Sequence, residues 1–184
     1  MLRDQGNTTG LTVWFTGLPS AGKTTLARAV EKRLVDGGRP VEVLDGDLVR
    51  THLTRELGFS KEDRVENVRR VGFVADLLSR NGVIVLCSVI SPYRDARDEV
   101  RRLHGERYFE VYVATPLDIC AARDVKGLYA RQRAGEVTGL TGVDDPYEPP
   151  LHPDLVVPTQ TQSVEESVEI VWEALPAWAR NGKE

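Results

Sequence analysis

The sequence has few of the residues that cross-link small proteins or hold structural metals. Its two cysteines, Cys87 and Cys120, form no C-x-x-C pair. Its three histidines, His52, His104 and His152, are scattered singly, so no zinc-ligand spacing occurs. A chain of 184 residues can bury about 70% of its unfolded surface. We therefore expect it to fold without disulfides or structural metal, and both cysteines to be buried thiols.

Long apolar runs and an excess of positive charge are also absent. No apolar run approaches the ~18 residues of a membrane span, and residues 1–10 lack the pattern of a signal peptide. The net charge of −4 argues against a general nucleic-acid-binding protein. We expect one soluble, cytoplasmic domain over residues 1–184, with loose tails at 1–10 and 179–184 and no nucleic-acid or membrane partner.

Short apolar runs alternate with helical patterns along the chain. Strands are expected at residues 11–16, 41–44, 83–88, 108–113 and 155–157. Helices are expected at residues 23–35, 48–53, 61–79 and 163–175, with two more after Pro92 and Pro116. Ser60 and Ser163 are the expected N-caps of their helices, and residues 135–153, rich in Gly, Pro and Asp, should form a loop. The alternation predicts a parallel sheet covered by helices on both faces.

Residues 17–24, GLPSAGKT, match the phosphate-binding pattern G-x-x-x-x-G-K-[ST] between a predicted strand and a predicted helix. The glycines let backbone N–H groups surround phosphate oxygens, Lys23 can reach the β- and γ-phosphates, and Thr24 can ligate Mg²⁺. The expected ATP-binding residues of this loop are Gly17, Leu18, Pro19, Ser20, Ala21, Gly22, Lys23, Thr24 and Thr25. The expected fold is therefore α/β, a three-layer P-loop nucleoside-kinase-like fold with a mainly parallel five-stranded sheet.

Asp45-Gly46-Asp47 directly follows the second predicted strand. Carboxylates at such strand ends face the crevice where α/β proteins bind ligands. One of them could hold Mg²⁺ through water, and the other could accept a proton from a substrate hydroxyl. The structural alternative is an Asp-Gly turn that caps the next helix.

Arginines are abundant, 19 against 5 lysines. Arg64, Asn67 and Arg70, three residues apart, share one face of the helix at 61–79 and could bind phosphate or sulfate, although taken alone they favour a solvated face. The arginines expected on the surface are Arg94, Arg97, Arg101 and Arg102.

Taken together, these motifs resemble the adenylylsulfate kinase (APS kinase) family over nearly the whole chain from about Leu11. The resemblance rests on GLPSAGKTT at 17–25, LDGDLVR at 44–50, LGFS at 57–60, DRVENVRR at 63–70, ISPYR at 90–94, RDVKGLY at 123–129, AGE at 134–136, TG at 141–142 and DDPYEPP at 144–150. It implies that MgATP phosphorylates the 3′-hydroxyl of adenosine 5′-phosphosulfate, which gives 3′-phosphoadenosine 5′-phosphosulfate and ADP. It also implies a homodimer and raises ATP sulfurylase as a neighbouring partner.

The resemblance also implies roles for individual residues. Its acceptor-binding set is Asp47, Arg50, Phe59, Arg64, Asn67, Ile90, Ser91, Lys126 and Leu140. Asp47 is implied to lie near the 3′-hydroxyl, Asp45 nearer the metal with Thr24, and Phe59 on the adenine of the acceptor. Lys126 matches a lysine in the mobile part of the lid and substrate loop, residues 124–153.

Further positions follow from the same resemblance. Arg123 is implied to pack on the ATP adenine, with Thr159 beside it. Ser91 matches a position assigned to a phosphoserine intermediate in relatives, a role that direct in-line transfer does not need. The expected catalytic residues are Lys23, Asp47, Ser91 and Lys126.

Two residues depart from the family pattern. Leu140 stands where the family usually has a Phe on the opposite face of the acceptor adenine from Phe59, so stacking worth about 0.5–1.5 kcal/mol would be lost. Phe73 stands where Glu is common, either in the core or on a dimer surface.

Two alternative functions remain: a related P-loop kinase for another anionic nucleotide or metabolite alcohol, and a nucleotide-dependent regulatory ATPase. A GTPase is disfavoured because N-K-x-D is absent.

Overall fold

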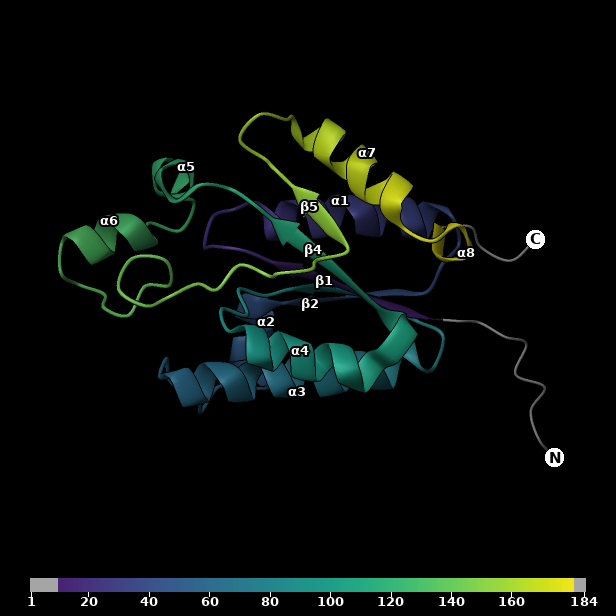
Figure 1. Ribbon diagram of the computed structural model, residues 1–184, viewed down its shortest axis with the longest axis horizontal. Helices are drawn as coiled ribbons and strands as arrows, with labels where there is room; N and C mark the ends of the chain where they lie inside the picture. Colours follow the sequence, from purple (N-terminus) through teal and green to yellow (C-terminus); the bar gives the residue numbers. More distant parts are fainter. Residues whose placement is uncertain (1–9, 181–184) are drawn as a thin grey trace.

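A five-stranded parallel sheet forms the centre of the computed structural model, which describes residues 10–180 (Figure 1). Its strands are β1 (Leu11–Thr16), β2 (Val41–Asp45), β3 (Ile84–Ser88), β4 (Tyr108–Val113) and β5 (Leu155–Val157). They lie in the order β2-β3-β1-β4-β5, and every neighbouring pair is parallel. The predicted sheet is therefore confirmed, with strand ends within one residue of those expected.

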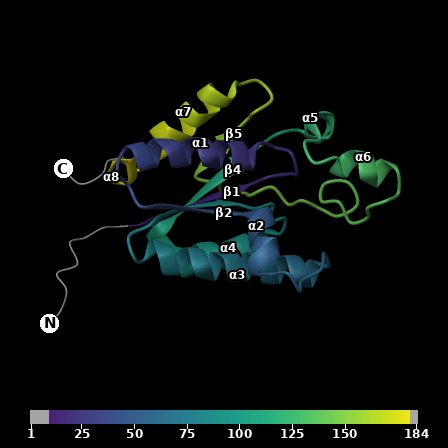
Figure 2. The same cartoon turned by 180° about the vertical axis from the view of Figure 1, so that it is seen from behind.

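Helices cover both faces of the sheet, as Figures 1 and 2 show from opposite sides. The elements are α1 (Lys23–Asp36), α2 (Gly46–His52), α3 (Lys61–Ser79), α4 (Arg94–His104), the 3₁₀ turn η1 (Gly105–Arg107), α5 (Leu117–Arg123), α6 (Leu128–Arg133), α7 (Val164–Ala174) and α8 (Ala177–Arg180). Helices α1 and α7 lie on one face and α3 and α4 on the other, whereas α5 and α6 extend past the end of the sheet. Within residues 10–180, none of these helices combines the length and the apolar character that crossing a membrane requires.

The central strand β1 shows why both faces must be covered, since all six of its residues are buried. Val13 and Phe15 belong to the hydrophobic cluster under α1 and α7. Trp14 belongs to the second cluster, together with Val71 of α3 and Cys87 of β3. Successive side chains of a strand point to opposite faces, so an apolar strand feeds two cores.

Local signals for helix ends and cysteines are confirmed. The Ser60 hydroxyl accepts a hydrogen bond from the Asp63 N–H at 3.1 Å and caps α3. Ser163 and Glu166 form a reciprocal capping box at the start of α7. Cys87 and Cys120 are buried free thiols, and burial raises the pKa of both.

Three expectations about exposure need correction. Arg97, expected on the surface, is 2% exposed because the carboxylate of Glu110 pairs with it inside the fold at 3.1 Å. Most of the expected loose tails lie outside the described residues, but Gly10 is buried against the Ser79 and Val83 carbonyls, and Ala179 is buried in α8. Phe73 is 56% exposed, so the alternative that placed it in the core is wrong.

Candidate active site

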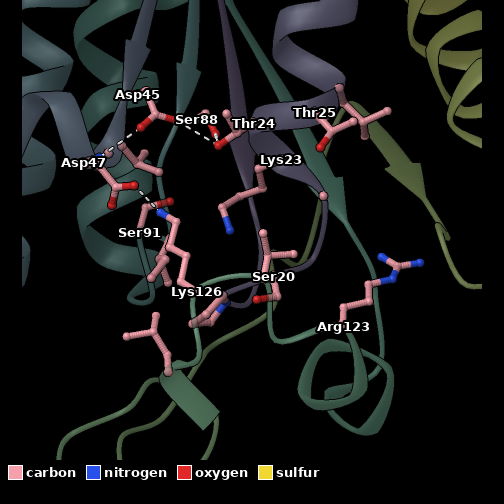
Figure 3. Close-up of a pocket in the computed structure, with 18 of the residues that line it drawn as sticks. Ser20, Lys23, Thr24, Thr25, Asp45, Asp47, Ser88, Ser91, Arg123 and Lys126 are labelled. Atoms are coloured by element: carbon pink, nitrogen blue, oxygen red, sulfur yellow. Dashed lines mark hydrogen bonds and ion pairs between the residues drawn. The ribbon is translucent and has the colours of Figure 1, made fainter. Parts of the chain in front are cut away.

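A cavity of about 750 Å³ opens at the carboxyl edge of the sheet (Figure 3). The loop after β1, the Asp45–Asp47 segment after β2 and residues 88–92 after β3 form its walls, together with residues 123–128 and 159–167. Carboxyl ends of parallel strands meet at one edge of a sheet, and ligands of open α/β sheets bind outside that edge. Residues 59–68, which lead into and form the start of α3, also line the cavity, so the structure brings residues from six separate segments of the chain together.

The loop over residues 17–24 has the backbone of a phosphate cradle. Gly17 and Gly22 adopt φ angles of 154° and 107°, and Ser20 adopts 61°. A Cβ on Gly17 would lie 2.7 Å from the Val113 carbonyl oxygen, so only glycine fits there. The loop runs directly into the N-terminus of α1, where backbone N–H groups and the helix dipole favour an anion.

Lys23 lies inside this loop and is 8% exposed. Its ammonium donates to the carbonyl oxygens of Gly17 at 3.0 Å and Leu18 at 2.7 Å. Burial, with the nearby charge of Lys126, lowers the pKa of Lys23 to about 8, although Cys120, Asp45 and Asp47 oppose the shift. A phosphate in the loop would favour the charged form of this lysine and raise its pKa again.

Other loop residues support the cradle from behind. The Ala21 carbonyl accepts hydrogen bonds from the hydroxyls of Thr115 at 2.9 Å and Thr159 at 3.1 Å. The Tyr129 hydroxyl donates to the Pro19 carbonyl at 3.0 Å. Gly17, Leu18 and Ala21 thus belong to the loop without lining the cavity, whereas the remaining expected loop residues line it.

The side-chain oxygens of Thr24, Asp45 and Ser88 lie close together (Figure 3). The Thr24 hydroxyl donates to Asp45 Oδ2 at 2.8 Å and lies 3.0 Å from Ser88 Oγ. Asp45 also caps α2 by accepting the Asp47 N–H at 3.1 Å. The structural alternative, in which this segment caps the next helix, is therefore confirmed for Asp45. Hydroxyl and carboxylate oxygens suit a hard cation such as Mg²⁺, which usually takes its other ligands from water and phosphate.

Asp47 and Lys126 form an ion pair across the cavity (Figure 3). Asp47 lies in α2, and Lys126 lies in the connection between α5 and α6. Both side chains are more than half exposed. Gly127, next to Lys126, has a φ of 66°, and a Cβ added to it would meet none of the described residues within 4 Å. The described protein therefore leaves open space beside the backbone at Gly127.

Phe59 lines the end of the cavity where the resemblance leads us to expect the acceptor, and it is 66% exposed. The guanidinium of Arg50 lies 4.6 Å from the ring centroid, and that of Arg64 lies 5.6 Å from it. Arg50 also donates to the carbonyls of Leu57 at 3.0 Å and Gly58 at 2.7 Å. Burial and the neighbouring Arg64 lower the pKa of Arg50, so this end of the cavity favours an anion.

Arg64 and Asn67 are not on a solvated face, and that interpretation is wrong for both. Arg64 donates to the Phe59 carbonyl at 2.8 Å, to Thr141 Oγ1 at 2.8 Å and to the Gly139 carbonyl at 2.6 Å, and it pairs with Asp145 at 3.0 Å. Asn67 accepts from the Thr54 hydroxyl at 2.7 Å. Arg70 pairs with Glu66 and Glu56 instead, and it does not line the cavity.

Ile90 and Ser91 line the cavity in the turn after β3. Ser91 has a φ of 42°, which is rare for a residue with a side chain. Its hydroxyl accepts from the Trp14 indole at 3.0 Å and donates to Thr16 Oγ1 at 3.0 Å, and the residue is 3% exposed. The hydroxyl thus points into the protein, and its phosphorylation stays a prediction.

Arg123 and Thr159 lie together at the nucleotide end. Arg123 donates to Thr159 Oγ1 at 3.0 Å and to the Thr159 carbonyl at 2.8 Å.

Several lining residues were not predicted from the sequence: Ser88, Val89, Pro92, Val125, Leu128, Gln162, Ser163, Val164 and Ser167. Ser88 ends a strand, and Val89, Pro92, Gln162 and Ser163 lie in connections that follow one, so for these five the position at a strand end was the available signal.

Leu140 is the one expected acceptor residue that the structure does not bring to the cavity. It is 6% exposed and packs in the hydrophobic cluster that contains Tyr129 and Cys120. An aliphatic side chain gains more from this apolar cluster than from the open cavity, which explains its position. Leu140 therefore does not line the cavity, and its expected contact with the acceptor adenine stays a prediction.

Comparison with known proteins gives a consistent result. The sequence model of the family described as "Adenylylsulphate kinase" matches residues 9–158. The adenylyl-sulfate kinase of Rippkaea orientalis is 59% identical over 166 residues, 90% of this chain and 91% of that protein. The adenylyl-sulfate kinase of Halothermothrix orenii is 59% identical over 169 residues, 92% of this chain and 91% of that protein.

A solved structure shares both the sequence pattern and the fold. It is the APS kinase of Mycobacterium tuberculosis in complex with AMPPNP and APS. Its TM-score to this chain is 0.86 at 45% identity, with 90% of this chain and 97% of that chain covered. The hexameric APS kinase from Thiobacillus denitrificans has a TM-score of 0.71 at 37% identity and covers 96% of this chain and 30% of that chain.

Proposed function

This chain belongs to the adenylylsulphate kinase family, and we propose that the cavity at the carboxyl edge of its sheet carries out the family's reaction. The protein is an adenylylsulfate kinase, which transfers the γ-phosphoryl group of ATP to the 3′-hydroxyl of adenosine 5′-phosphosulfate. The products are 3′-phosphoadenosine 5′-phosphosulfate and ADP. The observation that supports the residue roles best is that Asp47 shares one cavity with the phosphate cradle and with the cationic surroundings of Phe59.

At the nucleotide end, the cradle over residues 17–24 would bind the ATP phosphates through its backbone N–H groups. Lys23 would leave the Gly17 and Leu18 carbonyls and neutralise the β- and γ-phosphates. Arg123, which Thr159 holds in place, would pack on the adenine.

The oxygen cluster beside the cradle suits the cation that accompanies ATP. Thr24 and Asp45 would hold Mg²⁺, Asp45 through water, with Ser88 beside them. The cation supplies charge neutralisation between the β- and γ-phosphates when bound. Asp45 is already fixed by its cap of α2, so it needs no rearrangement to serve.

At the acceptor end, Phe59 would stack on the adenine, and Arg50 would neutralise the phosphosulfate. Arg64 has its donors engaged by Phe59, Gly139, Thr141 and Asp145, so its main role is to hold Phe59 and the 139–145 segment around the acceptor. Asn67 and the turn at Ile90 and Ser91 would complete the wall.

The transfer itself needs a group that accepts the proton of the hydroxyl and a cation that neutralises the phosphate charge. Asp47 would accept the proton of the 3′-hydroxyl as the new O–P bond forms and the bond between the γ-phosphorus and the bridging oxygen of ADP breaks. Lys126 must release Asp47 for this to happen, and phosphate groups in the cavity would offer it a stronger partner. The open space beside Gly127 allows that movement.

The resemblance also supports three expectations about the molecule in the cell. We propose a homodimer whose surface includes exposed Phe73, since an exposed aromatic side chain of this size favours an interface. The hexameric state belongs to the Thiobacillus denitrificans protein named above. A neighbouring ATP sulfurylase and a cytoplasmic location, where ATP is available, stay predictions.

Release of ADP from MgATP, measured with and without micromolar adenosine 5′-phosphosulfate, tests this function. We expect release that depends on the acceptor and a nucleotide product that carries a 3′-phosphate. Adenosine 5′-monophosphate, which lacks the sulfate, is the control acceptor and should react poorly. Binding of ATP without acceptor-dependent turnover would contradict the assignment and favour another acceptor alcohol or a regulatory ATPase.

A further inference from the structure

Arg97 of α4 is the most deeply buried charged residue in the core at 2% exposure, and none of the roles above uses it. Its three nitrogens reach three different parts of the fold. Nε pairs with Glu110 of β4 at 3.1 Å, Nη1 donates to the Ser91 carbonyl at 2.5 Å, and Nη2 donates to the Glu148 carbonyl at 2.6 Å. The planar guanidinium is the side chain that can bridge three acceptors in fixed directions.

The Ser91 end of this bridge is a strained turn that lines the cavity. Ser91 keeps a φ of 42°, which persists only where surrounding contacts fix it. Arg97 holds its carbonyl, while Trp14 and Thr16 hold its hydroxyl. Of these contacts, the hydrogen bond from Arg97 is the one made to the backbone of the turn by a charged donor, the strongest kind.

The Glu148 end leads to the other side of the acceptor site. The Glu148 N–H donates to the Pro92 carbonyl at 2.8 Å, and its carboxylate accepts from the Arg94 N–H at 2.9 Å. Three residues earlier, Asp145 pairs with Arg64, which in turn holds the Phe59 carbonyl. Arg97 therefore joins the turn at residues 90–92 to the segment that reaches Phe59.

We infer that Arg97 is a positioning residue, which fixes the distance between the Ser91 turn and the residue 145–148 segment and so sets the width of the acceptor site. It does not line the cavity and acts through Ser91 and Glu148. This inference rests on the proposed function, because it assigns the turn to the acceptor end. Buried ionic pairs are costly to desolvate, so a position that fixes geometry explains why one is present here.

A charge-neutral double variant, Arg97→Met with Glu110→Met, tests the inference without leaving an unpaired buried charge. Replacing a buried pair by apolar residues of similar size is often neutral or stabilising, so this variant should fold. We expect the KM for adenosine 5′-phosphosulfate to rise about 10- to 100-fold while the KM for ATP stays within about twofold. Arg97→Lys, which can keep one of the carbonyl contacts, should fall between the double variant and the wild type.

The matched control is Arg101→Gln, on the same helix. Arg101 shares Glu110 at 3.5 Å and pairs with Asp154 at 2.7 Å, but it touches neither the turn nor Glu148. Both KM values should stay unchanged in this variant. A purely structural role for Arg97 would lower the fraction of folded enzyme, hence kcat, and leave both KM values alone, which would overturn the inference.

A second measurement does not depend on turnover. The Trp14 indole donates to Ser91 Oγ, so the NMR signal of its N–H reports on the turn, and Trp14→Phe assigns it. We expect this signal to shift in the double variant and to stay in place in Arg101→Gln. An unshifted signal, or a shifted signal with an unchanged acceptor KM, would overturn the inference. Absence of turnover in the wild type would instead contradict the proposed function, and an unshifted signal would still refute the role of Arg97.

Discussion

Two lysines of the cavity are engaged by protein groups at the positions where we propose that phosphate binds. Lys23 hydrogen bonds to the carbonyls of its own loop, and Lys126 pairs with Asp47. Each cation is therefore neutralised or hydrogen-bonded by the protein itself, and both must exchange these partners for phosphate in the reaction that we propose.

Replacement of the expected proton acceptor separates catalysis from nucleotide binding. Asp47→Asn should lower kcat by about 10²- to 10⁴-fold, the usual contribution of a general base. Affinity for ATP, measured by calorimetry, should change little, because Thr24, Asp45 and the cradle remain. A variant with near wild-type kcat would remove Asp47 from the proton transfer.

Protonation of Lys23 gives a pH-dependent signature of ATP binding. Its pKa is lowered to about 8 by burial in the nucleotide-free protein, and phosphate oxygens beside it favour the charged form and raise the pKa again. At a pH between the pKa of Lys23 without nucleotide and its raised pKa with ATP, binding of ATP must take up a proton. The uptake should exceed about half a proton per ATP at about pH 8.5 and fall almost to zero below about pH 6.5.

Calorimetry in buffers of different ionisation enthalpy measures this uptake directly. Lys23→Arg is the control, since a guanidinium stays protonated throughout, and its proton uptake should vanish. Equal uptake in the wild type and in Lys23→Arg would show that another group takes the proton.

The sequence predicted those site residues whose chemistry depends on local spacing. Lys23, Thr24, Asp45 and Asp47 belong to short motifs at strand ends, and all four line the cavity. Arg64 and Arg70 share the same helical spacing, and the distant residues Gly139, Thr141 and Asp145 help decide that Arg64 is the one held inside. Arg97 was mispredicted for the same reason. No local pattern indicates that Glu110, thirteen positions later in the chain, pairs with it in the core.

At the scale of elements, helix α3 and the 139–145 segment act as one unit around the acceptor end. Arg64, Asp145 and Thr141 connect them, and Gly142 packs closely against Leu18 of the phosphate-binding loop. Arg64 thus holds a segment without helix or strand at Gly139, Thr141 and Asp145, and buried Leu140 anchors the same segment in the core. Among these contacts, the carboxylate of Asp145 is the charged partner of Arg64.

Asp145→Asn should loosen this segment. Because Arg64 is almost buried, loss of its charged partner should cost about 1–2 kcal/mol of the free energy of unfolding. Hydrogen exchange of the backbone amides at residues 139–145 should become faster than in the wild type. Glu136→Gln is the control, since Glu136 is 62% exposed and pairs only loosely with Arg131, and faster exchange there as well would contradict the role of Asp145.

The sequence predicted the elements better than their connections. Mainly apolar runs such as LTVWFT predicted the strands, because a strand buried on both faces, as β1 is, has no solvent-facing positions that call for charged residues. Helix α6, over Leu128–Arg133, was not predicted. Six residues are too few for a periodic signal, and Asp124 starts it from outside by accepting the N–H groups of Tyr129 and Ala130.

At the scale of the whole molecule, the two helical layers differ in what they expose. The α3 and α4 layer carries Phe73, 56% exposed, on the opposite face of the sheet from α1, which carries Val35, 55% exposed. Phe73 buries far more area when it is covered than Val35 does, so the α3 layer is the better candidate for self-association.

Light scattering over a range of protein concentrations tests this surface. Phe73→Glu should shift the average mass toward the monomer, because a charge in an apolar interface is costly. Val35→Glu, on the other layer, should leave the mass unchanged. An unchanged mass in Phe73→Glu would place the association surface elsewhere.

The position of β1 in the sheet affects how the protein can fold during its synthesis on the ribosome. This strand leaves the ribosome first among the five, yet its hydrogen-bonding neighbours are β3 and β4, about seventy and a hundred residues later. Sheet pairings of such high contact order form slowly, and unpaired apolar strands expose the nascent chain to aggregation. The nucleotide site that we propose includes Arg123 and Thr159, which emerge later still. All five strands must therefore be synthesised before that site is complete and bound ATP can favour the native state.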